Sequence, residues 1–259
     1  MFMILFTIHL FMMTDRNTIQ DTIPAVTPSD GIVSGRHIPA YKNRWEMIAV
    51  YPDGSVEHRG FWNDEVSFTQ DNSGREILKR KQIVEYKDHL SIQEEEVFRD
   101  NLQHKHLAIY NSGEEPHTDI YYSDHKIWGR KVFRVEGLQR VAQMPLKFSY
   151  ELSTPVFDWH LWGILISGFP LEIDYRARFL AHESYSYLPG DFRWYTLHVT
   201  GIDTIDTDLW NRVACYTVDV KAEVNWKMWI AMDKSIPPVQ QILIVHTDGV
   251  QLWWKPVRT

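Results

Sequence analysis

The chain has 259 residues, of which 44% are hydrophobic and 14% aromatic, and its formal net charge at pH 7 is −7. A chain of this length can bury a large core as one domain or as two packed halves, without help from a metal or a disulfide. The negative charge argues against the basic face that nucleic-acid binding requires, so we expect no nucleic-acid partner. Cys215 is the single cysteine, which excludes an intrachain disulfide.

Residues 1–13, MFMILFTIHLFMM, are apolar enough for the core of a signal peptide. No lysine or arginine precedes this stretch, however, and no small-residue cleavage site follows it. Three interpretations stay open: an atypical export signal, an extension ahead of a start at Met13, and a short membrane-surface anchor. We expect a cytoplasmic protein, exported or periplasmic only if residues 1–13 act as a signal, and in contact with a membrane only if they are a real segment.

Residues 1–44 are expected to form a flexible or extended lead, because prolines and glycines interrupt the stretch that follows the apolar start. Residues 45–259 are expected to form a single β-rich domain. An alternative is two packed halves that meet near 153–171. It is suggested by two similar hairpin sequences, WEMIAVYPDGSVEHRGFW near the start and QILIVHTDGVQLWW near the end.

Short runs of β-branched and aromatic residues, separated by turn residues, predict about a dozen or more strands. This pattern predicts a mainly β fold, a large curved antiparallel sheet or a barrel-like roll. The expected strands lie at 45–51, 55–62, 65–70, 75–86, 90–98, 104–110, 120–122, 126–135, 146–152, 173–179, 191–200, 214–220, 224–232, 239–246 and 250–255.

The middle of the chain carries the longest uncharged apolar run after the N-terminus, PVFDWHLWGILISGFPL, over residues 155–171. Thr154 suits an N-cap, Pro155 suits a first helical position, and apolar residues follow at three- and four-residue steps. A helix that is apolar on nearly all sides is buried, and about 14 residues are too few to cross a bilayer. We therefore predict one buried central helix at about 156–168, wrapped by the strands.

Several short motifs in the second half carry a resemblance. They are the helix end Pro170-Leu171, the strand end Val199-Thr200-Gly201, Cys215-Tyr216-Thr217-Val218, Trp229-Ile230-Ala231-Met232-Asp233 and the strand from Val239. Over 157–254 the chain resembles a bacterial β-rich domain-of-unknown-function family of envelope and cytoplasmic proteins. The resemblance implies a curved antiparallel sheet rolled around a helix, and it implies no catalytic residue. Lipocalin-like proteins and lipoprotein-carrier half-barrels are similar in architecture alone.

The chain holds 11 tryptophans, which is more than filling a core of this size requires. In a rolled sheet some of these rings would line an apolar cavity, the usual form of a small-molecule site. The alternative is a solid core with the indole nitrogens at its edge. The residues we predict to bind a ligand are Trp128, Trp159, Trp162, Trp194, Trp226 and Trp229.

Two pairs are candidates for chemistry. Asp158 and His160 stand at the head of the predicted helix, where a carboxylate could tune an imidazole, although two residues apart they would not face each other. His104 and His106 would share one face of a strand at the spacing of a metal pair, with a third ligand drawn from His117, Asp119 or His125. We expect exposed histidines there rather than a metal site, and no cofactor.

Two further positions could hold reactive groups. His182-Glu183 could form an acid/base cluster, but we expect a solvated loop. Cys215 lies in an apolar strand and is expected to be an inert small hydrophobe rather than a nucleophile.

Three functions fit these features. The first, which we expect, is a soluble β-roll protein that binds an apolar or aromatic small molecule between sheet and helix. The second is a structural or interaction protein with a solid core and no ligand. The third is a metal-independent enzyme of the isomerase or hydratase type, which would use Asp158, His160 or a nearby tyrosine.

Overall fold

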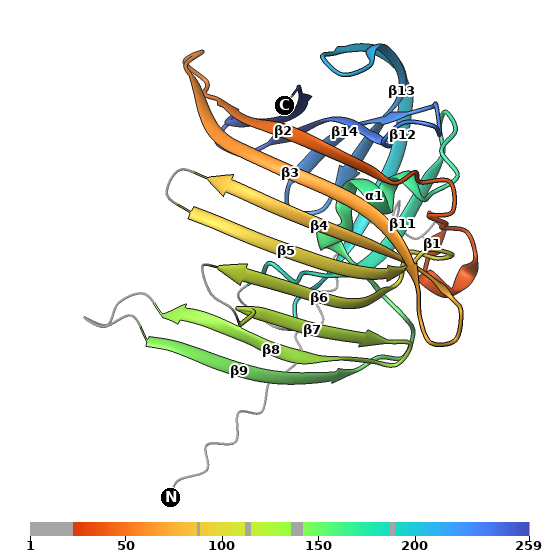
Figure 1. The fold of residues 1–259 in the computed structure, drawn as a ribbon. Coiled ribbons are helices and arrows are strands. Elements are labelled where there is room, and N and C mark those ends of the chain that lie inside the picture. The colour runs from red at the N-terminus through yellow and green to blue at the C-terminus, as the bar shows by residue number, and fades with distance from the viewer. Residues whose placement is uncertain (1–22, 87–88, 112–114, 136–141, 187–189, 259) are drawn as a thin grey trace, which may run out of the picture.

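The computed structural model describes residues 23–86, 89–111, 115–135, 142–186 and 190–258, so residues 1–13 and the roles predicted for them lie outside the described part. One curved, 16-stranded sheet dominates the structure (Figure 1). Its first nine strands are β1 (Ala25–Val26), β2 (Tyr41–Val50), β3 (Val56–Gln70), β4 (Glu76–Tyr86), β5 (His89–Phe98), β6 (His104–Asn111), β7 (Thr118–Ser123), β8 (Lys126–Val135) and β9 (Ala142–Glu151).

A helical segment and seven more strands follow. The strands are β10 (Phe157–Asp158), β11 (Arg176–His182), β12 (Phe192–Thr207), β13 (Asn211–Lys221), β14 (Asn225–Ala231), β15 (Val239–Val245) and β16 (Gln251–Val257). The helical turns are the 3₁₀ helices η2 (Pro28–Asp30) and η3 (Trp159–Leu161) and the α-helix α1 (Trp162–Ser167).

The strand order joins the two ends of the chain in the middle of the sheet. Strand β16 pairs antiparallel with β2, so the two similar hairpins lie side by side. From β2 the strands run in sequence order to β9, and from β16 they run back to β11, to which β1 and β10 add in parallel. Strands β9 and β11, near the two edges of the sheet, therefore come from the middle of the chain, and the segment that connects them carries α1.

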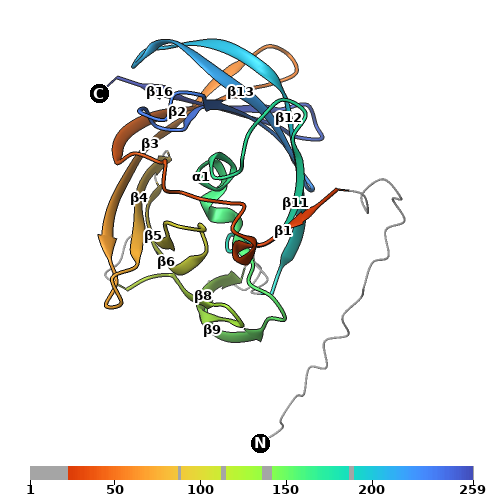
Figure 2. The same ribbon diagram turned by 90° about the vertical axis from the view of Figure 1, so that its right-hand side faces the viewer.

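The predicted central helix is confirmed as a buried element, with α1 at the centre of the ring of strands (Figure 2). It is shorter than the predicted 156–168, because residues 157–158 form β10 and pair with β11 instead of forming the first turn of the helix. The helical turns start at η3, where the Asp158 carboxylate accepts a hydrogen bond from the backbone nitrogen of His160 at 2.8 Å. Among the described residues, none of the helices has the length and apolar character needed to cross a membrane.

The main core lies between α1 and the concave face of the sheet. All six residues of α1 are buried, and the cluster around them draws on both halves of the chain. It also includes Val26, Val33 and Ile38. Part of the segment that the sequence predicts as a lead thus packs into the core.

The curved antiparallel sheet agrees with the predicted mainly β fold, but several strands, β3 and β12 among them, are longer than the pattern suggests. The strands predicted at 55–62 and 65–70 form the single strand β3. The apolar alternation breaks at Asp64 because this buried carboxylate is paired with the Arg80 guanidinium, at 2.7 Å between Oδ1 and Nε. In the sequence, a charged residue between two apolar runs looks like part of a turn, although here it is buried and paired with a residue on the neighbouring strand.

Candidate ligand-binding site

A cavity of about 450 Å³ lies between the concave face of the sheet and the η3–α1 segment. Strands β2, β3, β4 and β5 provide one wall, and strands β12, β14, β15 and β16 provide another. The turn after β11 and the turn between β13 and β14 complete the lining. The cavity therefore exists only where both halves of the sheet close over the helix.

Aromatic and aliphatic side chains together make up most of this lining. Tyr195 stacks on Trp159 with ring centroids 4.1 Å apart, and Trp159 meets Trp226 edge-on at 5.4 Å. On the other side Trp62 contacts Trp162 at 4.9 Å. The tryptophans that line the cavity are Trp62, Trp159, Trp162, Trp226 and Trp254, and the aliphatic side chains between them are Met47, Val84, Val224 and Ile244.

Local geometry explains why these rings converge. Trp159 and Trp162 are three residues apart in η3 and the first turn of α1, so their side chains leave the same side of the segment. Trp254 faces Met47 across the β16–β2 pair, and Trp62 faces Val84 across the β3–β4 pair. Side chains directly opposite on neighbouring strands project to the same face of a sheet.

The polar part of the lining is small. The Tyr185 hydroxyl donates to the side-chain oxygen of Gln93 at 3.1 Å. Glu183 accepts a hydrogen bond from the Tyr195 hydroxyl, and the Arg193 guanidinium donates to Glu223 at 2.5 Å. Burial raises the pKa of the Glu183 carboxyl above its ordinary value.

Three of the six tryptophans that we predict as ligand-binding meet in the cavity: Trp159, Trp162 and Trp226. The other three do not line it. Trp128 is 38% exposed and stacks on Tyr121, and Trp194 is 51% exposed beneath the Arg178 guanidinium. Trp229 packs on Trp253 in a separate small cluster, and its indole nitrogen donates to Asp203.

Sequence reasoning missed several lining residues. Trp62 and Trp254 were candidates only as members of the tryptophan set, and Tyr185, Tyr195 and Glu183 were not selected as ligand-binding. The expected solvated loop at His182-Glu183 is wrong, because His182 is 1% and Glu183 is 8% exposed. The alternation of β12 could have identified Tyr195 as the neighbour of Trp194 on the opposite face.

Asp158 is fully buried at the centre of a hydrogen-bond network. Its carboxylate accepts hydrogen bonds from the Tyr122 hydroxyl at 2.5 Å and from the Ser184 hydroxyl at 2.8 Å. His182 Nδ1 lies 2.9 Å from the same carboxylate. Burial acts to raise the pKa of Asp158, but the hydrogen bond from His182 and the charges of His104 and His182 outweigh it and lower the pKa well below the ordinary value.

A second buried network surrounds Glu95. Its carboxylate oxygens lie 2.8 Å from His160 Nδ1 and 2.9 Å from His104 Nε2, and the Arg80 guanidinium is 3.6 Å away. Burial again opposes ionisation, yet the charge of His160 and the bonds from both histidines lower the pKa of Glu95. His160 is covered by Tyr185, whose ring stacks on it at 4.4 Å.

Both networks lie behind the cavity wall rather than in it. Asp158 and His160 are fully buried and are absent from the cavity lining. The Ser184 and Tyr122 hydroxyls both donate to Asp158, and the Tyr122 hydroxyl also lies 3.2 Å from His182 Nδ1. Burial raises the pKa of the Cys215 thiol to about 12, as expected for an inert cysteine.

The predicted common face for His104 and His106 is wrong. The β5–β6 pairing aligns Val97 with His104 and Glu96 with His106, which leaves Lys105 as an extra residue in a β-bulge. His104 therefore points into the core, whereas His106 points outward and binds Asp119 at 2.8 Å. Within the described ranges, no three histidine, cysteine or acidic side chains gather as a metal site would require.

The two buried carboxylates predict a specific loss of stability in acid. The pKa values of Glu95 and Asp158 are lower in the folded state than their ordinary values of 4.5 and 3.8, so their contribution is fully present above about pH 5 and is lost as the pH falls. Each group changes the free energy of unfolding by up to about 1.4 kcal/mol per pH unit in that range. Urea unfolding followed by tryptophan fluorescence at pH 7, 5, 4 and 3 measures the effect.

A matched pair of variants tests the assignment. Glu95→Gln is expected to flatten the acid dependence, whereas Glu94→Gln is expected to keep the wild-type profile because Glu94 is 45% exposed on the outer face. A wild-type stability that stays constant from pH 5 to pH 3 would contradict the prediction.

The fold and the cavity define a mainly β roll around a short helix. No family model and no curated protein matches the sequence. Among solved structures, the chain is similar to the beta-barrel-like protein of domain of unknown function DUF1849 from Brucella abortus. That match has 10% identity and a TM-score of 0.46, and it covers 87% of this chain and 98% of the other.

Proposed function

We propose that this protein binds an apolar or aromatic small molecule in the cavity between sheet and helix, without transforming it. The observation that carries the proposal is the cavity itself. Its volume of about 450 Å³ falls within the range of about 300–1,000 Å³ that small-molecule sites occupy, and its walls are mainly tryptophan and aliphatic side chains. A few polar groups at the edge of such a pocket fix the orientation of a ligand.

The other two functions have less support. A structural protein with a solid core would fill this volume with side chains, whereas about 450 Å³ stays open between the aromatic and aliphatic side chains here. An enzyme that uses Asp158 or His160 would need these groups in the cavity wall, but both are enclosed in hydrogen-bond networks behind it.

Native mass spectrometry of the purified protein tests the proposal, since a ligand with an apolar body is expected to remain bound in part. Tryptophan fluorescence titrations with a panel of lipids and small aromatic compounds provide a second readout. At least one member of the panel is expected to change the emission, because five tryptophans line the cavity.

A cavity-filling variant makes the test specific. Val84→Trp is expected to abolish the fluorescence response, and Val56→Trp, at a position that is 66% exposed, is expected to preserve it. Unchanged fluorescence across the panel, together with no co-purifying molecule, would refute the proposal.

A further inference from the structure

One end of the aromatic cavity carries more negative than positive charge. The Arg193 guanidinium, which lines the cavity, bonds Asp191 at 2.6 Å and Glu223 at 2.5 Å, so one positive charge is shared by two carboxylates. Glu183 adds a third carboxylate, and it is 8% exposed. The sum of these four groups is negative.

Among the residues that the structure describes, no cation is bound to Glu183. Its contact is with the neutral hydroxyl of Tyr195, and among the described residues no lysine, arginine or histidine nitrogen forms an ion pair with its carboxylate. Lys131 acts on it at longer range, but the Lys131 ammonium is bonded to the backbone oxygens of Ser184 and Ser186. A buried carboxylate without a counter-ion is costly, and a ligand that brings a positive charge would offset that cost.

The rings next to Glu183 suit a cation as well. Tyr195 donates a hydrogen bond to Glu183 and stacks on Trp159, and Trp159 contacts Trp226. The carboxylate is therefore directly next to a group of aromatic rings. The faces of tryptophan and tyrosine rings carry negative electrostatic potential and attract organic cations. The protein uses this interaction beside the cavity, where the Arg80 guanidinium lies 5.0 Å from the centre of the Trp162 ring.

We propose that the ligand is an organic cation, a molecule with a protonated amine or a quaternary ammonium group on an apolar or aromatic body. This inference rests on the proposed function and specifies the ligand class for the same cavity. The charged group lies against Glu183 and the Tyr195–Trp159 stack, and the apolar body extends toward Trp62 and Trp162. An anionic ligand lacks a free partner there because Arg193 is already paired with two carboxylates.

The pKa of the Glu183 carboxyl is raised above its ordinary value at this end of the cavity. Burial raises the pKa of Glu183 most, and the nearby Asp158 and Asp191 raise it further. The Tyr195 hydrogen bond and the Arg193 charge act in the opposite direction without reversing the shift.

Two probes of equal shape separate charge from size. Benzyltrimethylammonium and neopentylbenzene differ only in that a quaternary nitrogen replaces a quaternary carbon, and phenylacetate provides an anion of similar length. Tryptophan fluorescence titration of the full-length protein is expected to give a dissociation constant at least tenfold lower for the ammonium compound than for neopentylbenzene. Phenylacetate is expected to bind more weakly than both.

Variants then locate the charge that is responsible. Glu183→Gln is expected to reduce the preference for the cation to about threefold or less, with the binding of neopentylbenzene unchanged. If this variant fails to fold, as judged by circular dichroism, Glu223→Gln provides the same test at a side chain that is 72% exposed. Glu94→Gln, on the outer face, is expected to retain the full preference.

The possible failures are distinguishable. Equal or tighter binding of neopentylbenzene or phenylacetate would overturn the cation inference and leave the proposed function standing. A cation preference that survives both glutamine variants would also overturn it. If none of the three probes binds and the wider aromatic panel also fails, the proposed function itself is refuted.

Discussion

Replacing Arg80 with alanine is expected to lower the free energy of unfolding by about 3 to 5 kcal/mol, the usual cost of removing one partner from a buried ion pair. The Arg80 side chain is 1% exposed and makes two hydrogen bonds to Asp64, at 2.7 and 3.1 Å. The substitution leaves Asp64 and Glu95 buried without this charge. Urea unfolding at pH 7 measures the loss.

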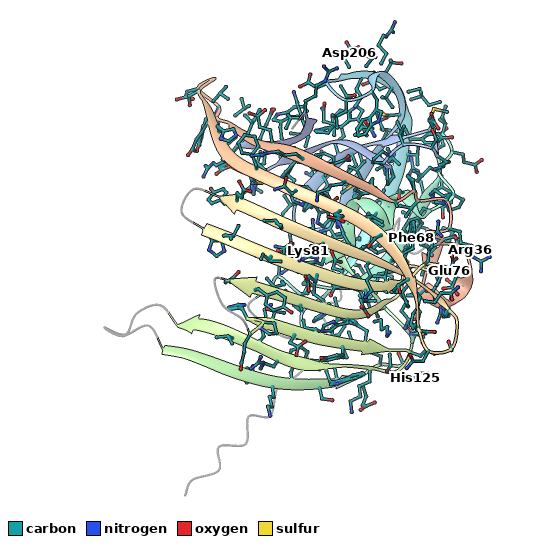
Figure 3. The ribbon with its side chains drawn as sticks, viewed as in Figure 1. Arg36, Phe68, Glu76, Lys81, His125 and Asp206 are labelled. Carbon is teal, nitrogen blue, oxygen red and sulfur yellow. The ribbon has the colours of Figure 1, made fainter. Side chains whose placement is uncertain are left out.

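The neighbouring residue offers the control. Lys81, labelled in Figure 3, follows Arg80 on β4 but pairs with Glu94 where both side chains are nearly half exposed. Lys81→Ala is therefore expected to cost about 1 kcal/mol or less. An Arg80→Ala variant as stable as Lys81→Ala would show that the buried network contributes little to the stability of the fold.

The Phe157→Ala variant is expected to lose about 3 to 5 kcal/mol of stability, because it opens a cavity where β10 meets the core. Phe157 is fully buried, and its ring lies 5.9 Å from that of Phe179 and 6.4 Å from that of Phe169. These neighbours belong to β11 and to the segment after α1, so the aromatic group connects the helix to an edge of the sheet. Chemical denaturation with an intrinsic fluorescence readout provides the measurement.

A second phenylalanine separates cavity formation from the loss of a ring. Phe61 lies on the outer face of β3, where the Arg44 guanidinium covers it at 4.1 Å. Phe61→Ala is expected to cost about 1 kcal/mol, since it removes a partly exposed contact and leaves no internal void. Equal losses in the two variants would contradict a core role for Phe157.

Local patterns were sufficient for the elements and for part of the site. Trp159 and Trp162 were expected to share a face from their separation alone, and both line the cavity. The failures have identifiable local causes. Asp158 was assigned to a helix, but it ends a short strand and caps the helical turn that follows. His104 and His106 were placed on one face, but a single extra residue between them reverses the alternation.

The sequence does not show which side chains of each strand face the concave side of the sheet. Trp194 and Tyr195 are neighbours on β12, as are Trp253 and Trp254 on β16, and alternation requires only that the members of each pair point in opposite directions. The choice depends on how the sheet curves around α1 and on which strands meet across it. Tyr195 and Trp254 line the cavity, whereas Trp194 and Trp253 do not.

Short-range periodicity and composition predict the mainly β class, most strand positions, the buried apolar segment in the middle of the chain and its excess of tryptophan. The three-dimensional arrangement is needed to show that the ends of the chain pair at the centre of the sheet, that two networks bury Asp158 and Glu95, and that Glu183 lines one end of an aromatic cavity. Each of these features joins residues that are far apart in the chain. Strand order, register and sheet curvature bring such residues together, and no local sequence pattern encodes these three properties.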